Sequence, residues 1–260
     1  MNITAGLEYD ERGGGAVPII CLHGIGGNIE SFQPQLDGLS AHHRIIALNL
    51  PGFGRSEMID PLDFPGLAAS LAEFIRAKGI ETAHLVGQSI GGMIALETAC
   101  QTPEMVKTLT MIGSTSAFGG RDDRFKEQFI RARLEPVETG TTIAELATRF
   151  VPEIVGPIAS EEVIKSAIAS MSAVPPDTYR AIIQCLVTFN RRADIANLPM
   201  PCCLIAGEVD QNAPAKTMAR MAETIPGAAF HVIKGAGHLI NLEAGPHCNT
   251  IISDFLAEHG

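Results

Sequence analysis

The fold of this chain is decided by the stretch Ala83-His84-Leu85-Val86-Gly87-Gln88-Ser89-Ile90-Gly91-Gly92-Met93-Ile94-Ala95-Leu96. It begins as a short apolar strand, passes through Gly-Gln-Ser-Ile-Gly, and continues as a helix of small and apolar residues. A Gly-x-Ser-x-Gly turn between a strand and a helix is typical of a nucleophile elbow, where the serine stands at the tip of a strained turn. The bare pattern also arises by chance, so the flanking strand and helix carry the argument. They predict that Ser89 is a nucleophile, placed where a helix N-terminus favours developing negative charge.

Short apolar strands alternate with helices on both sides of this stretch. Strands are expected at residues 17–22, 44–48, 83–86, 106–112, 202–206 and 229–233, and helices at 66–78, 214–225 and 246–258. This alternation predicts an α/β fold, with a doubly wound, mostly parallel sheet covered by helices on both faces. Functional loops in such a sheet lie at the carboxyl ends of the strands, and Ser89 occupies such a position.

The strand pattern stops after Ser114 and resumes only at Cys202. Between them lie helical stretches at residues 123–134, 142–150, 161–171 and 177–189, separated by Pro136, Pro152, Pro157, Pro175 and Pro176. Proline commonly ends a helix, so we interpret these positions as breakers. The sequence therefore predicts a core of residues 1–117 and 198–260 into which a helical cap, residues 118–197, is inserted.

A serine hydroxyl becomes nucleophilic only when a base takes its proton and an acid orients that base. In the doubly wound arrangement these groups follow in the order Ser, Asp or Glu, His. Asp210 and His238 each follow a later strand on a loop at the same sheet edge as Ser89. Glu208 and Asp194 remain alternatives for the acid, and a helix N-cap is the alternative role for Asp210.

Two other features of the motifs bear on the chemistry. Of the eight histidines, only His238 stands in a glycine-bracketed loop after the last strand. His23 precedes Gly24-Ile25-Gly26, a turn suited to supplying an oxyanion-hole N–H from Ile25, and the second N–H would come from Ile90. We expect His23 itself to shape this loop rather than to take part in the reaction.

Composition narrows the class of protein further. The 260 residues are 46% hydrophobic and 18% charged, which describes one ordinary folded soluble domain. A net charge of −10 argues against nucleic-acid binding. No segment resembles a signal peptide or approaches the roughly 20 apolar residues of a membrane span, so we expect a cytoplasmic protein without membrane association. The six cysteines show no CxxC spacing, which argues against a metal site and against disulfides.

The motifs together resemble the α/β-hydrolase fold superfamily over essentially the whole chain. The residues that carry the resemblance are His23-Gly24-Ile25-Gly26-Gly27, Pro51-Gly52-Phe53-Gly54-Arg55-Ser56, Gly87-Gln88-Ser89-Ile90-Gly91-Gly92, Gly207-Glu208-Val209-Asp210 and Gly235-Ala236-Gly237-His238. Within the superfamily, residues 235–243 and the cap length are similar to 3-oxoadipate enol-lactonases and small carboxylesterases. The resemblance implies a serine hydrolase that cleaves a small carboxylic ester or lactone through an acyl-enzyme, without a cofactor. The resemblance does not fix the oligomeric state, and a homo-oligomer stays open.

Three other activities within the superfamily stay open at this point. One is the hydrolysis of carbon–carbon bonds in aromatic degradation. Another is cofactor-free haloperoxidase or perhydrolase activity, whose members commonly carry an aromatic residue after the oxyanion turn. Phe32 would fill this position, and we expect it to bind substrate there. The third is a non-catalytic ligand-binding protein. Asn49 departs from the family, which often has Asp two residues before the proline of the second motif.

The predicted cap has a net charge closer to zero than the rest of the chain. Residues 118–197 hold 10 Lys/Arg against 11 Asp/Glu, a net of −1, whereas the rest holds 9 against 18, a net of −9. A carboxylated substrate would need a cation near the pocket, and the first cap helix offers Arg121, Arg124, Arg131 and Arg133. Arg131, which follows the apolar pair Phe129-Ile130, is the leading candidate for binding such a substrate. The alternative is that these arginines only form solvated surface ion pairs.

Overall fold

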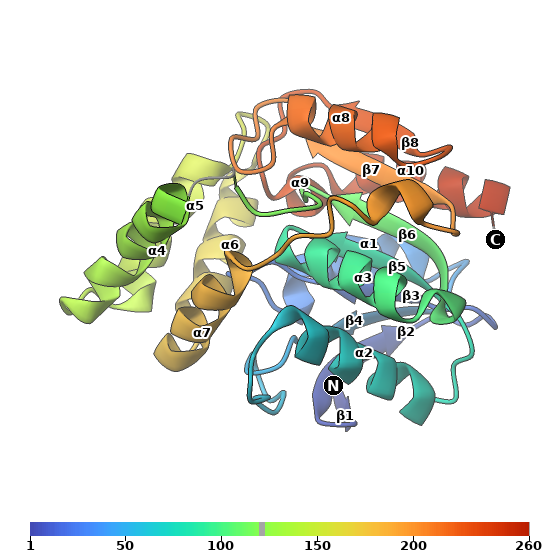
Figure 1. Cartoon of the computed structure of the whole chain (residues 1–260), viewed down its shortest axis with the longest axis horizontal. Coiled ribbons are helices and arrows are strands. Elements are labelled where there is room, and N and C mark those ends of the chain that lie inside the picture. The colour runs from blue at the N-terminus through green and yellow to red at the C-terminus, as the bar shows by residue number, and fades with distance from the viewer. Residues whose placement is uncertain (120–122, 260) are drawn as a thin grey trace.

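The computed structural model describes residues 1–119 and 123–259, and within them lies one eight-stranded sheet (Figure 1). The strand order is β1-β2-β4-β3-β5-β6-β7-β8. The strands are β1 (Asn2–Thr4), β2 (Leu7–Arg12), β3 (Ile19–Leu22), β4 (Ile45–Leu48), β5 (Ala83–Gln88), β6 (Val106–Ile112), β7 (Cys202–Gly207) and β8 (Ala229–Ile233). All pairs from β4 to β8 are parallel, so the α/β fold and the doubly wound, mostly parallel sheet are confirmed.

Helices cover both faces of this sheet. The helices of the core are α1 (Gln33–Leu39), α2 (Phe64–Ala77), α3 (Ile90–Gln101), α8 (Ala215–Thr224), α9 (Ile240–Glu243) and α10 (Gly245–His259), with short 3₁₀ turns at Ile29–Phe32, Pro103–Met105 and Ile195–Asn197. In β3, Ile20 and Leu22 belong to the apolar cluster that contains α2 and α3, whereas Ile19 and Cys21 belong to the cluster that contains α1 and α10. Because both faces of β3, β4 and β7 are buried, these strands are unbroken runs without polar side chains rather than alternating ones.

The hairpin β1–β2 was not expected from the sequence. Its strands pair antiparallel with each other, and β2 pairs antiparallel with β4. Polar residues interrupt this segment, and its role as a strand depends on the hydrogen bonds that β2 makes with β4 rather than on an apolar run of its own.

The order of the strands decides where the site lies. After β3 the chain places β4 on one side, and then crosses back to place β5 on the other side of β3. Ligands of open α/β sheets bind at such a reversal, outside the carboxyl ends of the strands. The loops that follow β3 and β5 therefore meet at this edge.

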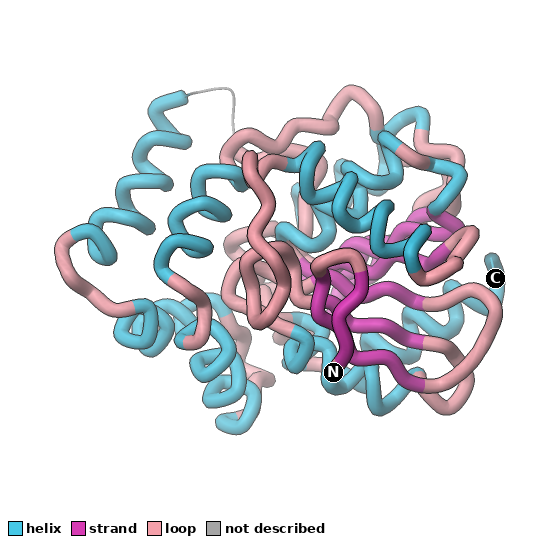
Figure 2. The backbone as a smooth tube through the Cα atoms, turned by 90° about the horizontal axis from the view of Figure 1, so that it is seen from below, coloured by secondary structure: helices cyan, strands magenta, loops and turns pink. Residues whose placement is uncertain are grey.

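Among the described residues, four α-helices lie between β6 and β7 and are called the cap; they stand beside the sheet at the left of Figures 1 and 2. They are α4 (Asp123–Glu138), α5 (Ile143–Ile154), α6 (Glu161–Ser172) and α7 (Pro176–Leu186). The insertion of helices agrees with the sequence analysis, while the boundaries at residues 118 and 197 stay predictions. Pro136 and Pro152 do not separate helices as expected, since each lies inside the last turn of a helix. A proline there removes a single backbone hydrogen bond, and the helix ends within a turn.

Candidate active site

Ser89 stands at a strained turn between β5 and α3. Its backbone has φ 54° and ψ −122°, a conformation that L-residues rarely adopt and that is maintained only where the surroundings impose it. The neighbouring glycines impose it here: a Cβ atom on Gly87 would overlap the backbone of Gly91, and one on Gly91 would overlap the carbonyl of Leu22 in β3. The tight crossing holds Ser89 at the N-terminus of α3, as the Gly-x-Ser-x-Gly pattern predicted.

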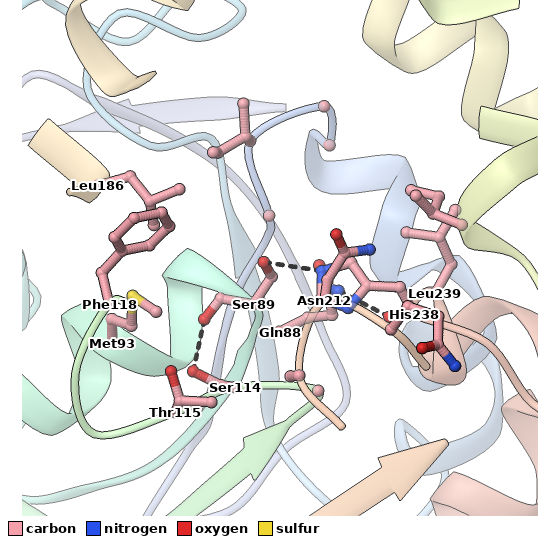
Figure 3. A pocket seen from close by; sticks show the side chains of 18 of the residues that line it. Gln88, Ser89, Met93, Ser114, Thr115, Phe118, Leu186, Asn212, His238 and Leu239 are labelled. Carbon is pink, nitrogen blue, oxygen red and sulfur yellow. Dashed lines mark hydrogen bonds between the residues drawn. The ribbon is translucent and has the colours of Figure 1, made fainter. Parts of the chain in front are cut away.

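The structure brings Ser89, His238 and Asp210 together in one hydrogen-bonded chain, of which Figure 3 shows the Ser89 and His238 part. The Oγ of Ser89 lies 3.0 Å from Nε2 of His238, and Nδ1 of His238 lies 2.8 Å from Oδ2 of Asp210. Both distances are within the reach needed for a nucleophile, its base and an orienting acid. In the geometry suited to this task, the His238 Nδ1–H donates to Asp210, which leaves Nε2 free to accept the serine proton.

Asp210 is held as a carboxylate. Its buried side chain also accepts backbone N–H groups from Asn212 at 2.7 Å and Ala213 at 3.1 Å. Burial by itself raises the pKa of Asp210, but the hydrogen bonds from His238 and from these amides outweigh burial and hold the pKa below its ordinary value. The two alternatives do other things: Glu208 accepts the backbone N–H of Gly235, and Asp194 pairs with Arg191.

Two backbone N–H groups near Ser89 are free to bind an anion. Ile25, in the loop after β3, lines the cavity described below, and Ile90 is the first residue of α3. Among the described residues, neither N–H donates a hydrogen bond. For Ile90 this follows from helix geometry, because the first N–H groups of a helix have no acceptor within it.

His23 shapes the loop after β3. It is fully buried, its Nδ1 lies 2.7 Å from the carbonyl oxygen of Gly24, and its Nε2 accepts the N–H of Leu50. Burial lowers the pKa of His23 to about 4, so the ring is neutral. Both ring nitrogens are used in the fold, which agrees with a structural role for this histidine.

The contacts of Asn49 explain why this chain has Asn where the family often has Asp. Its side-chain oxygen accepts the N–H of Ile29, and its Nδ2 donates to the carboxylate of Glu8, which also pairs with Arg55. An aspartate at this position would bring a second carboxylate against Glu8, so the amide fits where the family often has Asp.

The loop of His238 is fixed by residues that the sequence analysis did not single out. Gln88 donates from Nε2 to the carbonyl of His238 at 2.9 Å. Glu243 accepts the N–H groups of Gly237 and Leu239 and, from the end of the cap helix α5, that of Gly156. These side chains lie beside motif residues, but nothing in a sequence reports which backbone groups a side chain will reach across 150 positions.

A cavity of about 520 Å³ opens above Ser89, between the sheet edge and the cap (Figure 3). Its floor contains Ser89, His238 and the loop after β3, and most of its wall is apolar. The apolar side chains of the wall include Met93, Phe118, Phe129, Phe150, Val151, Met171, Ile183, Leu186 and Leu239. The arrangement can hold a small, largely apolar molecule with a carbonyl group at Ser89.

Two residues suggested for substrate binding lie elsewhere. Arg131 is exposed on α4 and is not among the residues that line the cavity, whereas Arg133 is. Phe32 is 1% exposed and packs in the core beneath the sheet with the residues of α1 and α10. Arg131 does not line the cavity because Phe125, Phe129 and Arg133 recur every four residues and share one face of α4, and residue 131 lies on another face. Arg121 lies outside the described residues.

Neither metal-ligating clusters nor disulfides are found in the described part of the chain. No group of three or more His, Cys, Asp or Glu side chains there is arranged to hold a metal ion, and the six cysteines are free. No helix of the described residues is long and apolar enough to cross a membrane.

Comparison with known proteins agrees with this architecture. Residues 17–245 match the family model of the alpha/beta hydrolase fold, and the chain belongs to that family. A putative carbamate hydrolase, RutD, from Azorhizobium caulinodans is 28% identical over 98% of this chain and 96% of its own. A thermophilic esterase from Thermogutta terrifontis superposes with a TM-score of 0.89 at 24% identity, over 98% of this chain and 94% of its own. The enol-lactonase from Burkholderia xenovorans LB400 gives a TM-score of 0.88 at 20% identity, over 96% of each chain.

Proposed function

We propose that this hydrolase cleaves a carboxylic ester or lactone through an acyl-enzyme formed on Ser89. The observation that carries the proposal is the hydrogen-bonded chain from Ser89 through His238 to Asp210, set at a strained elbow that opens into the cavity. Family membership supports hydrolysis, and the esterase and lactonase among the similar structures share the fold.

Each step of the proposed reaction is assigned to a particular side chain or backbone N–H group. His238 takes the proton of Ser89 as the oxygen attacks the substrate carbonyl, and Asp210 stabilises the imidazolium that forms. The N–H groups of Ile25 and Ile90 donate to the oxyanion of the tetrahedral intermediate. His238 then gives its proton to the leaving alcohol or, in a lactone, to the ring oxygen. Water, activated by the same histidine, releases the acid and restores the serine.

A covalent probe tests the nucleophile directly. A fluorophosphonate reagent, which reacts with activated serines, is expected to label the wild-type protein but not Ser89→Ala. Ser114→Ala is the matched control because Ser114 also lines the cavity yet uses its hydroxyl to donate to the Ser89 carbonyl. In the same preparations, Ser89→Ala should lower kcat by roughly 10³-fold or more with an unchanged fold. Labelling that persists in Ser89→Ala would exclude this serine and favour a binding protein or another nucleophile.

Assays on a panel of substrates identify the type of bond that the protein cleaves. We expect turnover of 4-nitrophenyl acetate and butyrate and of small lactones, with no requirement for an added metal or cofactor. A simple carbamate and a vinylogous 1,5-diketone belong in the panel, the former because a relative is named for carbamate hydrolysis. Cleavage of the diketone with no activity on esters or lactones would replace the proposal with carbon–carbon bond hydrolysis, and halide oxidation with peroxide would favour the haloperoxidase alternative.

A further inference from the structure

The four cap helices supply an apolar wall to the cavity with two exceptions. Of the side chains that α4 to α7 place on this wall, only Arg133 and Tyr179 are polar. A small number of polar groups in an apolar pocket usually fixes the orientation of a ligand. These two residues come from different helices, α4 and α7, and face the same cavity as Ser89.

Arg133 is held in place by aromatic rings rather than by a carboxylate. Its guanidinium carbon lies 4.0 Å from the ring centroid of Phe150 and 5.3 Å from that of Phe129. Stacking on aromatic faces orients a guanidinium without using its N–H donors. The side chain is therefore fixed, and its hydrogen-bonding groups are left for another partner.

No such partner is present among the residues that the structure describes. There, Arg133 makes neither an ion pair nor a hydrogen bond, although it is partly buried. Glu153 of α5 is near enough to favour its charge but is exposed and forms no ion pair with it. Burial lowers the pKa of Arg133 despite this carboxylate, because removal from water disfavours the cation. A bound anion would supply the missing counter-charge.

Tyr179 also has an unused hydrogen-bonding group. The residue is 2% exposed and lines the cavity, and its hydroxyl has no hydrogen-bond partner among the described residues. This oxygen does not belong to the fully buried, unpaired oxygens of the described residues, which are those of Gln35 and Thr110, so a ligand in the cavity can reach it. Burial raises the pKa of Tyr179, and the nearby charge of Arg133 opposes that shift, so the two groups interact. At neutral pH the phenol is a hydrogen-bond donor next to a cation.

We propose that Arg133 and Tyr179 form a subsite for a carboxylate carried by the substrate, at a distance from the bond that Ser89 attacks. Two arginines line the cavity among the described residues, but Arg192 is exposed and only Arg133 is partly buried. One guanidinium compensates one negative charge, which fits a carboxylate rather than a dianionic phosphate. The core, with its net charge of −9, offers no comparable compensation. The proposal rests on the hydrolase function above and gives it a substrate class: esters or lactones of monoanionic, carboxylate-bearing molecules.

Matched substrates measure the contribution of the charge. One pair carries the test group on the acyl part, as the mono-4-nitrophenyl ester of adipic acid and that of adipic acid monoamide. A second pair carries it on the alcohol part, as the acetate esters of 6-hydroxyhexanoic acid and of its amide. In at least one pair we expect wild type to prefer the acid by about tenfold or more in kcat/KM, mainly through KM, since charged hydrogen bonds contribute this much.

Variants assign that preference to the subsite. Arg133→Gln is expected to abolish the preference, Arg133→Lys to retain part of it, and Tyr179→Phe to reduce it, where the preference is the ratio of kcat/KM for the acid to kcat/KM for its neutral partner. Arg131→Gln removes the same charge from an exposed position two residues away, and it should leave the preference unchanged. Arg192→Gln tests the exposed arginine that also lines the cavity. A preference that survives Arg133→Gln, or that Arg192→Gln removes instead, overturns the proposal.

Calorimetry separates failure of the subsite from failure of the hydrolase proposal. In a Ser89→Ala background, hexanoate should bind about tenfold or more tightly than hexanamide, and Arg133→Gln should remove the difference. If wild type hydrolyses neutral esters through Ser89 but shows no preference for acids in either assay, the subsite is wrong and the proposed function stands. If no ester or lactone is turned over, the proposed function is wrong and the calorimetry alone decides the subsite.

Discussion

At the sheet edge, the side chains of Ser89, His238, Asp210 and His23 have partners within the fold, whereas on the cap wall the side chains of Arg133 and Tyr179 have none among the described residues. His23, Asp210 and the loop of His238 are fixed by hydrogen bonds to neighbouring backbone or side chains. The helices differ in the same way: α3 of the core buries ten of its twelve residues, but α4 of the cap buries only Leu134. Groups that must keep a fixed geometry belong to the closely packed core, and groups with unused hydrogen bonds lie where a ligand can reach them.

The largest expected effect tests the core. Asp210→Asn should lower kcat by roughly 10³- to 10⁴-fold, because an amide favours the wrong tautomer of His238. Glu208→Gln is the control, since Glu208 lies two residues away and accepts only the N–H of Gly235 among the described residues. Steady-state kinetics on one ester, with circular dichroism to confirm the fold, make the comparison. If Glu208→Gln is the more damaging change, the acid has been misassigned.

Close packing in the core also predicts an unequal response to the same substitution. Gly91→Ala should destabilise the protein by about 3 kcal/mol or more, because its Cβ atom would overlap the Leu22 carbonyl in β3 and part the helix from the strand. Gly140→Ala in the cap meets no atom within 4 Å and should cost only about 1–2 kcal/mol, from its φ of 103°. Denaturant unfolding gives both values. Equal losses would show that the cap is packed as tightly as the core.

The smallest effect concerns the contribution of histidines to the loss of stability in acid, which comes from the core because residues 118–197 contain no histidine. Burial lowers the pKa of His84, and likewise that of His23, to about 4. An unfolded histidine titrates near 6.5, so between these values the unfolded state binds more protons and the free energy of unfolding falls as pH falls. His84→Gln should reduce this slope by up to about 1.4 kcal/mol per pH unit.

Unfolding curves from pH 7 to pH 4.5 measure that slope. His231→Gln is the matched control because His231 is exposed on β8, where folding changes its surroundings little. An unchanged slope in His84→Gln would mean that His84 does not contribute to the loss of stability in acid.

The sequence by itself determined the parts that local rules specify. Mainly apolar runs predicted β3 to β8 within about two residues, because strands in the middle of a sheet that helices cover on both faces need such runs. Residues 87–91 predicted the elbow, because only glycine permits the close crossing of strand and helix that lifts Ser89. Asp210 and His238 followed from chain order and from the rule that parallel strands present their carboxyl ends at one edge.

Only the tertiary structure decided which cap side chains face the cavity and which groups lack partners there. The sequence favoured Arg131, although the recurrence of Phe125, Phe129 and Arg133 every four residues was already a signal for Arg133. Whether that face turns inward depends on how α4 packs against α7. That Arg133 stacks on Phe150 and lies beside Tyr179 depends on how α4 packs against α5 and α7. Such contacts follow from the shapes and packing of whole helices, so no local pattern in the sequence reports them.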